Sequence, residues 1–152
     1  MSARLKGNLK RLERLLHLRE TYVSVAEAGV KLAEGEVRRL ENADSEAAGN
    51  IQHTQAEIAY LKTATGNDVQ ASERYIQALK QQRKTIHQSL ETATTNLAQR
   101  RSEWTEAMKE QKIIEKLQER RLHQSEREDD VANQKAQDDA FIGRYVRTRI
   151  ED

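Results

Sequence analysis

Apolar residues recur in the first part of the chain at steps that alternate between four and three residues. The series begins at Leu5 and ends at Leu61, and fourteen of its seventeen positions are apolar. The three polar positions are Arg19, Asp44 and Thr54. A repeat of about 3.5 residues keeps one stripe of a helix against a partner helix as the two supercoil. The pattern therefore predicts a long helix over residues 4–62 with a coiled-coil seam.

A second series with the same steps follows after a gap. It runs from Val69 to Ile114, and ten of its fourteen positions are apolar. Beyond Ile114 the register slips slightly through Leu117, and the stripe thins. The positions to which it thins are Val131, Phe141 or Ile142, and Tyr145. We therefore expect a second helix, over residues 68–145, whose last part has no continuous seam.

The residues between the two series carry the signals of a tight connection. Gly66 can take the left-handed conformation that ends many helices. Asn67, followed three residues later by a glutamine, resembles a capping box, and Asp68 adds negative charge at the positive end of the next helix. We place the turn at residues 63–67. A break at residues 42–50 is the weaker alternative, because the heptad register runs through that stretch.

Two long helices joined by such a turn fold back antiparallel. Folding at Gly66 places residue i opposite roughly residue 131 − i, so Leu5 faces the neighbourhood of Glu126. Trp104 then falls opposite residues 26–29, where the small residues Ala26, Ala28 and Gly29 leave room for its ring. The position of the turn rests on other residues, so this match independently supports the pairing.

The second helix is longer than the first, so its end has no partner after Arg127. We predict an all-α fold, a long antiparallel two-helix coiled-coil hairpin with an overhanging C-terminal helix, as a single domain over residues 1–152. Apolar residues on a long unpartnered helix usually indicate a missing partner. Fraying at the terminus is the alternative interpretation.

The polar seam residues also have a predicted role. Asp44 and Arg83 fall nearly opposite each other by the same pairing, so we expect an ion pair between the two helices. A polar residue in a coiled-coil seam lowers stability but selects the register and the partner.

Composition removes most other classes of protein. Charged residues make up 34% of the chain, proline and cysteine are absent, and there are six glycines. Such a chain has too few turn residues for a sandwich, a barrel or a βαβ fold, and it can form no disulfide or thiolate metal site. No stretch approaches the roughly 18 apolar residues of a membrane span, and the N-terminus has no signal-peptide pattern. We therefore expect a cytoplasmic protein.

The sequence offers no candidate catalytic, cofactor-binding or metal-binding residues. No two of the four histidines lie three or four residues apart, so no helix face presents a histidine pair to a metal. There is no glycine-rich nucleotide loop and no nucleophile elbow. Carboxylates on a helical hairpin face water, where no dry pocket tunes them. We expect no enzyme activity.

Nucleic-acid binding is also disfavoured. Lysine plus arginine number 26 and aspartate plus glutamate 25, so the formal net charge is only +1. The basic pairs are interrupted by acids, whereas a basic leucine-zipper arm is a dense, acid-free stretch.

Several segments carry a family likeness. They are residues 12–20 of the first helix and residues 75–80, 97–104, 107–121 and 134–141 of the second. Together with the length and the placement of the turn, they resemble the flagellar FliJ proteins over essentially the whole chain. The YscO-type stalk proteins of virulence secretion systems are close relatives.

The resemblance implies a function that spacing alone does not show. Proteins of the FliJ family are cytoplasmic parts of the flagellar type III export apparatus, peripheral to the inner membrane through their partners. Their coiled coil is similar to the central stalk of rotary ATPases and promotes assembly of the hexameric export ATPase ring. They also contact the cytoplasmic domain of the export gate and handle export chaperones.

Two sets of residues are implied by position in that family. The contact with the ATPase ring would use the two ends of the chain: Leu5, Leu9, Arg11, Arg14, Leu117, Arg120, Arg121, Gln134, Asp138, Phe141 and Tyr145. The contact with the export gate would use Tyr60, Tyr75 and Leu79. Leu79 also lies in the predicted seam, so core packing is its alternative role. The polar Gln82, on the next turn, differs from some relatives.

A second hypothesis for the whole chain needs no secretion role. It is a generic coiled-coil scaffold or a homodimeric interaction protein. The mass in solution separates the two, because a hairpin is monomeric and a continuous helix would be dimeric.

Overall fold

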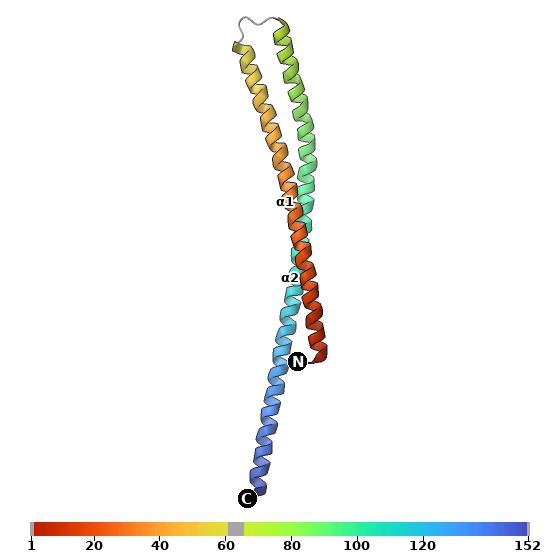
Figure 1. Cartoon of the computed structure of the whole chain (residues 1–152), viewed down its shortest axis with the longest axis vertical. Coiled ribbons are helices and arrows are strands. Elements are labelled where there is room, and N and C mark those ends of the chain that lie inside the picture. Colours follow the sequence, from red (N-terminus) through yellow and green to blue (C-terminus); the bar gives the residue numbers. More distant parts are fainter. Residues whose placement is uncertain (1, 61–65, 152) are drawn as a thin grey trace. The chain divides into compact units, whose positions relative to one another are not determined.

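The computed structural model describes residues 2–60 and 66–151, and every secondary-structure element in them is helical (Figure 1). Helix α1 spans Ala3–Tyr60 and helix α2 spans Gly66–Glu151. The two helices pack against each other as a hairpin, which confirms the predicted fold class.

The helix boundaries differ only slightly from the predicted ones. Helix α1 is continuous through residues 42–50, so the alternative break there is wrong. Helix α2 begins at Gly66 itself and continues past residue 145 to Glu151. The predicted turn at residues 63–67 falls mostly outside the described residues, which resume at Gly66.

The contacts of the chain form two compact units. The hairpin unit is Ser24–Thr105, and the terminal unit combines the described residues up to Val23 with those from Glu106 onward. Within the hairpin unit the orange-to-yellow part of α1 and the green part of α2 lie side by side (Figure 1).

The core of the hairpin unit is a line of three small hydrophobic clusters. Their buried members are Val30, Ala33 and Leu97, then Leu40, Ile86 and Ala93, and finally Ile51, Ile76 and Leu79. Every buried hydrophobic residue described in this unit occupies a predicted seam position. Full burial of a large aliphatic side chain contributes about 1.5–3 kcal/mol, so these clusters hold the two helices together.

Contacts between the helices show that the pairing is antiparallel. Arg101 of α2 lies 3.4 Å from Glu34 of α1, and Arg83 lies 2.9 Å from Asp44, so numbers fall on α2 as they rise on α1. Both pairs are within about one helical turn of the position 131 − i. The predicted ion pair between Asp44 and Arg83 is therefore confirmed.

Trp104 packs against the cluster of Val30, Ala33 and Leu97. In α1, Val30 and Ala33 of that cluster follow residues 26–29, which the sequence places opposite the ring. The close neighbour of Gly29 is the stem of Arg100, whose Cδ would lie 3.7 Å from an added Cβ.

In the terminal unit, the seam of α2 continues through polar residues. Gln118 is half-buried and Ser125 is buried, at positions that continue the steps of four and three beyond Ile114, and Asp129, one residue past the next such position, is half-buried. The expected slip of register does not occur at Leu117, since that side chain lies exposed. On α1, Leu5 is buried.

Burial ends at Asp129. Every residue from Asp130 to Glu151 is exposed except the half-buried Gly143, although the helix continues without interruption.

Candidate interaction surfaces

The described residues offer several exposed surfaces that can contact partners. No group of histidine, aspartate and glutamate side chains in them could hold a metal ion. No stretch of the described helices is both long and apolar enough to span a bilayer.

The first surface lies on the last part of α2. Gln134, Asp138, Phe141 and Tyr145 follow one another at steps of four, three and four, so they share one face of the helix. Phe141 is 71% exposed, and the guanidinium carbon of Arg149 lies 5.6 Å from the ring centroid of Tyr145. We call these four residues the C-terminal stripe.

The other residues expected at the ATPase ring are not all accessible. Leu5 is buried and Leu9 half-buried, so both face the seam of the terminal unit. The exposed ones are Arg11, Arg14, Leu117, Arg120 and Arg121. Arg14 lines a groove with Leu16, His17 and Gln118.

The residues expected at the export gate lie on the hairpin unit, and they separate into two kinds. Tyr60 is almost fully exposed and lines a shallow hollow with His53, whose Nε2 lies 2.9 Å from Glu57 Oε1. Tyr75 is half exposed. Leu79 is buried in the cluster with Ile51 and Ile76, so the structure places it in the core.

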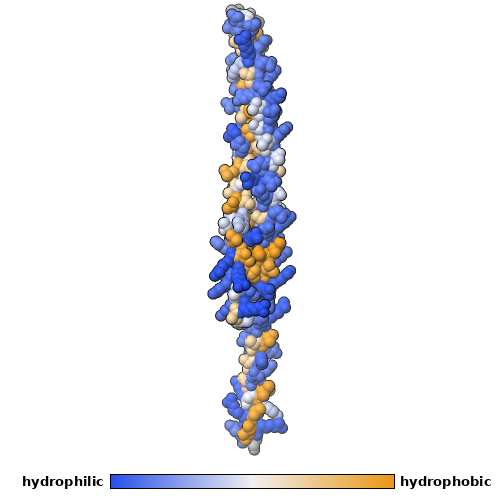
Figure 2. Space-filling view, turned by 90° about the vertical axis from the view of Figure 1, so that its right-hand side faces the viewer, coloured by the Kyte–Doolittle hydropathy of each residue, from blue (hydrophilic) through white to orange (hydrophobic). Residues whose placement is uncertain are grey.

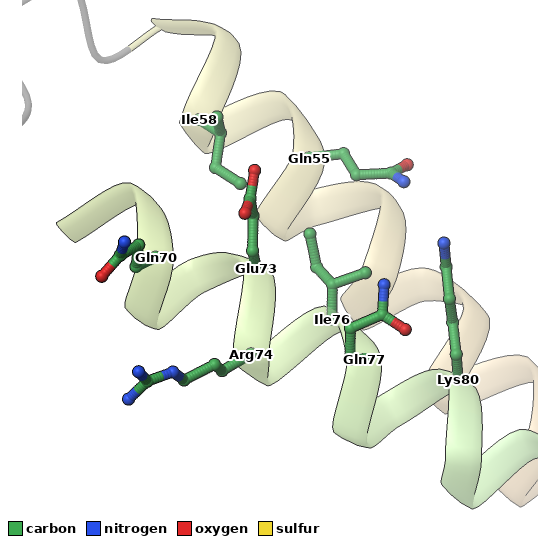
Figure 3. A pocket seen from close by; sticks show the side chains of 8 residues that line it. All are labelled: Gln55, Ile58, Gln70, Glu73, Arg74, Ile76, Gln77 and Lys80. Atoms are coloured by element: carbon green, nitrogen blue, oxygen red, sulfur yellow. The ribbon is translucent and has the colours of Figure 1, made fainter. Parts of the chain in front are cut away.

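An open groove of about 810 Å³ lies next to these residues, between the two helices (Figure 3). The side chains of Ile58 and Ile76 point into the space between the helices, while Arg74, which also lines the groove, directs its guanidinium away from the other helix. Charged and amide side chains complete its lining: Gln55, Gln70, Glu73, Gln77 and Lys80. Its mixed lining suits contact with a protein surface better than with a small apolar ligand.

The hairpin unit also holds a half-buried charged group. Asp44 Oδ1 accepts a hydrogen bond from Arg83 Nε at 2.9 Å and lies 3.0 Å from His87 Nε2. The Arg83 guanidinium holds the pKa of the Asp44 carboxyl below its ordinary value, against the opposing effect of burial. His87 lowers this pKa further.

The sequence interpretation missed one further feature, on the terminal unit. Leu15, Leu18 and Tyr22 are each more than 40% exposed, and they lie one residue before seam positions of α1. Their own spacing of three and four is the signal that could have found them. Figure 2 shows that hydrophobic side chains do gather in a patch between charged neighbours on the face that it draws.

The fold and the exposed side chains together indicate the general class of the protein. A coiled-coil hairpin with apolar side chains exposed along its helices belongs to a class of proteins that commonly act by binding other proteins.

The family comparison identifies which one. The family model for the flagellar FliJ protein matches residues 8–149 of this chain. The chain therefore belongs to the FliJ family, as its resemblance indicated, and is a component of flagellar type III protein export. This family is a structural part of the export apparatus and is not known as an enzyme. No curated protein and no solved structure gives a significant match.

Proposed function

We propose that this chain is a cytoplasmic, central-stalk-like coiled coil that binds the hexameric type III export ATPase and promotes assembly of its ring. The observation that carries the proposal is the exposed segment of α2 beyond Asp129. It combines an uninterrupted helix with large exposed apolar side chains, which supports the need for a partner.

The C-terminal stripe is the proposed contact with the ring, together with the exposed Arg11, Arg14, Leu117, Arg120 and Arg121. Leu5 and Leu9 act indirectly in this proposal, because their packing in the seam fixes the helices that carry the arginines. Phe141 and Tyr145 are the apolar anchors, since a few large side chains usually dominate the energy of an interface.

The test is ATP hydrolysis by the export ATPase of the same organism, measured against added chain. We expect stimulation that saturates near one chain per ring. A variant lacking residues 131–152 should not stimulate, and the double variant Phe141→Ala/Tyr145→Ala should stimulate weakly. Leu32→Ala is the matched control, because Leu32 is also a large exposed side chain but lies in the hairpin unit.

Folding of the variants is checked separately. Trp104, the sole tryptophan, lies in the hairpin unit and reports on that unit by fluorescence. Full stimulation by the truncated chain would contradict the proposed role of the C-terminal segment. Absence of stimulation by the intact chain would contradict the stalk role. It would favour the alternative hypothesis of a generic coiled-coil scaffold.

A second contact is proposed on the hairpin unit, with the cytoplasmic domain of the export gate. Its accessible residues are Tyr60 and Tyr75, while Leu79 supports the surface from the core. Binding of the isolated gate domain should weaken in Tyr75→Ala and stay unchanged in Leu32→Ala. The chain is also proposed to handle export chaperones. It is further proposed to act as a monomer, and sedimentation equilibrium measures its mass in solution directly.

A further inference from the structure

One flank of the terminal unit is defined by contacts of Arg19. Its guanidinium forms an ion pair with Glu110 of α2, and its Cζ lies 5.7 Å from the centroid of the Tyr22 ring on α1. Glu110 and Tyr22 therefore lie on the same flank of the helix pair.

Four more apolar side chains share this flank. Leu15 and Leu18 precede Tyr22 by seven and four residues, and residues at these spacings share a helix face. Ile113 and Leu117 follow Glu110 by three and seven residues on α2. All are at least 36% exposed. We call the five apolar residues the flank patch: Leu15, Leu18, Tyr22, Ile113 and Leu117.

The opposite flank has a different character. Its groove is lined mainly by polar and charged side chains: Glu13, Arg14, Leu16, His17, Glu20 and Gln118. The apolar side chains are thus concentrated on one side, which gives α1 a second apolar seam beside the one that faces α2. A helix with two seams can pack against two other helices.

Arginines border one end of the flank patch. Arg11 lies four residues before Leu15, and Arg120 lies three residues after Leu117. Because the helices are antiparallel, both continue the patch in the same direction, and Arg4 and Arg127 follow one heptad further on. All four are exposed, and none has a hydrogen-bond or ion-pair partner among the described residues.

We propose that the flank patch and these four arginines dock one amphipathic helix of a partner protein, with carboxylates at one end of its apolar stripe. Two parallel apolar faces suit a helix whose side chains repeat at three and four residues. Unpaired guanidinium groups suit carboxylates, which they bind through two parallel hydrogen bonds.

A second copy of this chain fits the face less well. The carboxylates at the other end of the patch are already paired, Glu110 with Arg19 and Glu106 with Lys109. A second copy that docked through this same patch would therefore bring to the arginines carboxylates that are already paired. The patch shares Arg11, Leu117 and Arg120 with the proposed ATPase contact, but the proposal does not depend on that function.

The probe is a labelled synthetic amphipathic peptide with leucines at three- and four-residue spacing and glutamates at one end. Its binding to the full chain is measured by fluorescence anisotropy, without the ATPase, so this test and that of the proposed function fail independently. We expect saturable binding that weakens as salt rises. A peptide with glutamine in place of glutamate should bind more weakly and lose the salt dependence.

Matched variants locate the site. Leu18→Glu should weaken binding by roughly tenfold or more, as expected for a central apolar contact. Leu122→Glu should not, since Leu122 is as exposed but lies four residues after Gln118, on the opposite flank. Arg11→Glu should weaken binding, whereas Arg14→Glu, the same charge change on the opposite flank, should not. Circular dichroism checks that each variant keeps its helices.

Four outcomes would overturn the proposal. They are absence of peptide binding, equal effects of the variants on the two flanks, self-association that Leu18→Glu abolishes, and phosphatidylserine-vesicle binding that follows the same variants. The third would make the occupant a second copy, and the fourth would make it a membrane surface.

Discussion

Asp44 of α1 and Arg83 of α2 form a two-point ion pair across the hairpin. Asp44 Oδ1 lies 2.9 Å from Arg83 Nε, and Oδ2 lies 3.3 Å from Nη2. Both residues occupy seam positions, between the clusters of Leu40 and of Ile51. A shift of the helices by one turn would move the carboxylate about 5.4 Å from the guanidinium, so the pair specifies the register.

Exchange of the two charges tests this role. Asp44→Arg and Arg83→Asp should each lower the thermal midpoint of unfolding, because each places like charges together in the half-buried seam. The double variant Asp44→Arg/Arg83→Asp should recover most of the loss. Differential scanning calorimetry provides the double-mutant cycle. A double variant as unstable as the sum of the single ones would show that the pair does not set the register.

The same pair makes stability depend on pH. Arg83 holds the pKa of Asp44 below its ordinary value of 3.8, so the folded state favours the ionised carboxylate. This contribution is complete above about pH 4 and is lost as the pH falls through the lowered folded-state pKa.

Asp44→Asn should therefore lower the thermal midpoint at neutral pH and weaken its decline at acid pH. Glu36→Gln is the control. Its partner Arg39 also lowers the pKa of Glu36, but this ion pair lies within α1 and does not join the helices. Thermal midpoints measured from about pH 2 to 7 compare the two variants. Identical pH profiles for Asp44→Asn and the parent chain would contradict the assignment.

The core makes a separate prediction about burial. Leu97→Ala should lower the free energy of unfolding by about 2–5 kcal/mol, because it opens a cavity beside Val30 and Ala33. Leu32→Ala, at a side chain that is 78% exposed, should change it by less than about 0.5 kcal/mol. Urea unfolding followed by circular dichroism measures both values.

The residues of the seam could be predicted from the sequence, but the exposed interaction surfaces could not. A period of 3.5 residues fixes which side chains face the partner helix, so Leu40, Ile51 and Leu97 could be predicted as core. The continuation of the seam through Ser125 could not be predicted from hydrophobicity, because this buried residue is polar. Which apolar side chains stay exposed depends on where α2 stops covering α1. The hydrophobicity of the sequence does not encode that position.

Leu79 illustrates the limit for functional residues. Its family position suggested a contact with the export gate, and its seam position suggested the core. The structure places it in the core beside Ile76. Tyr60 and Tyr75, which lie off the seam, keep their side chains exposed and available to a partner.

Trp104 leads to the last prediction. Its ring packs on Val30, Ala33 and Leu97, and its Nε1 is buried with no hydrogen-bond partner among the described residues. A buried donor without a partner costs about 1–3 kcal/mol. Trp104→Phe removes that donor and keeps an aromatic ring against the cluster, so the lost contact area is offset.

We expect Trp104→Phe to change the free energy of unfolding by less than about 1 kcal/mol, and Trp104→Ala to lower it by roughly 2–3 kcal/mol, since the ring is half-buried. Circular dichroism in urea measures both, because the variants lack the sole tryptophan. Equal losses for the two variants would show that the indole nitrogen finds a partner, such as an ordered water, which phenylalanine cannot bind.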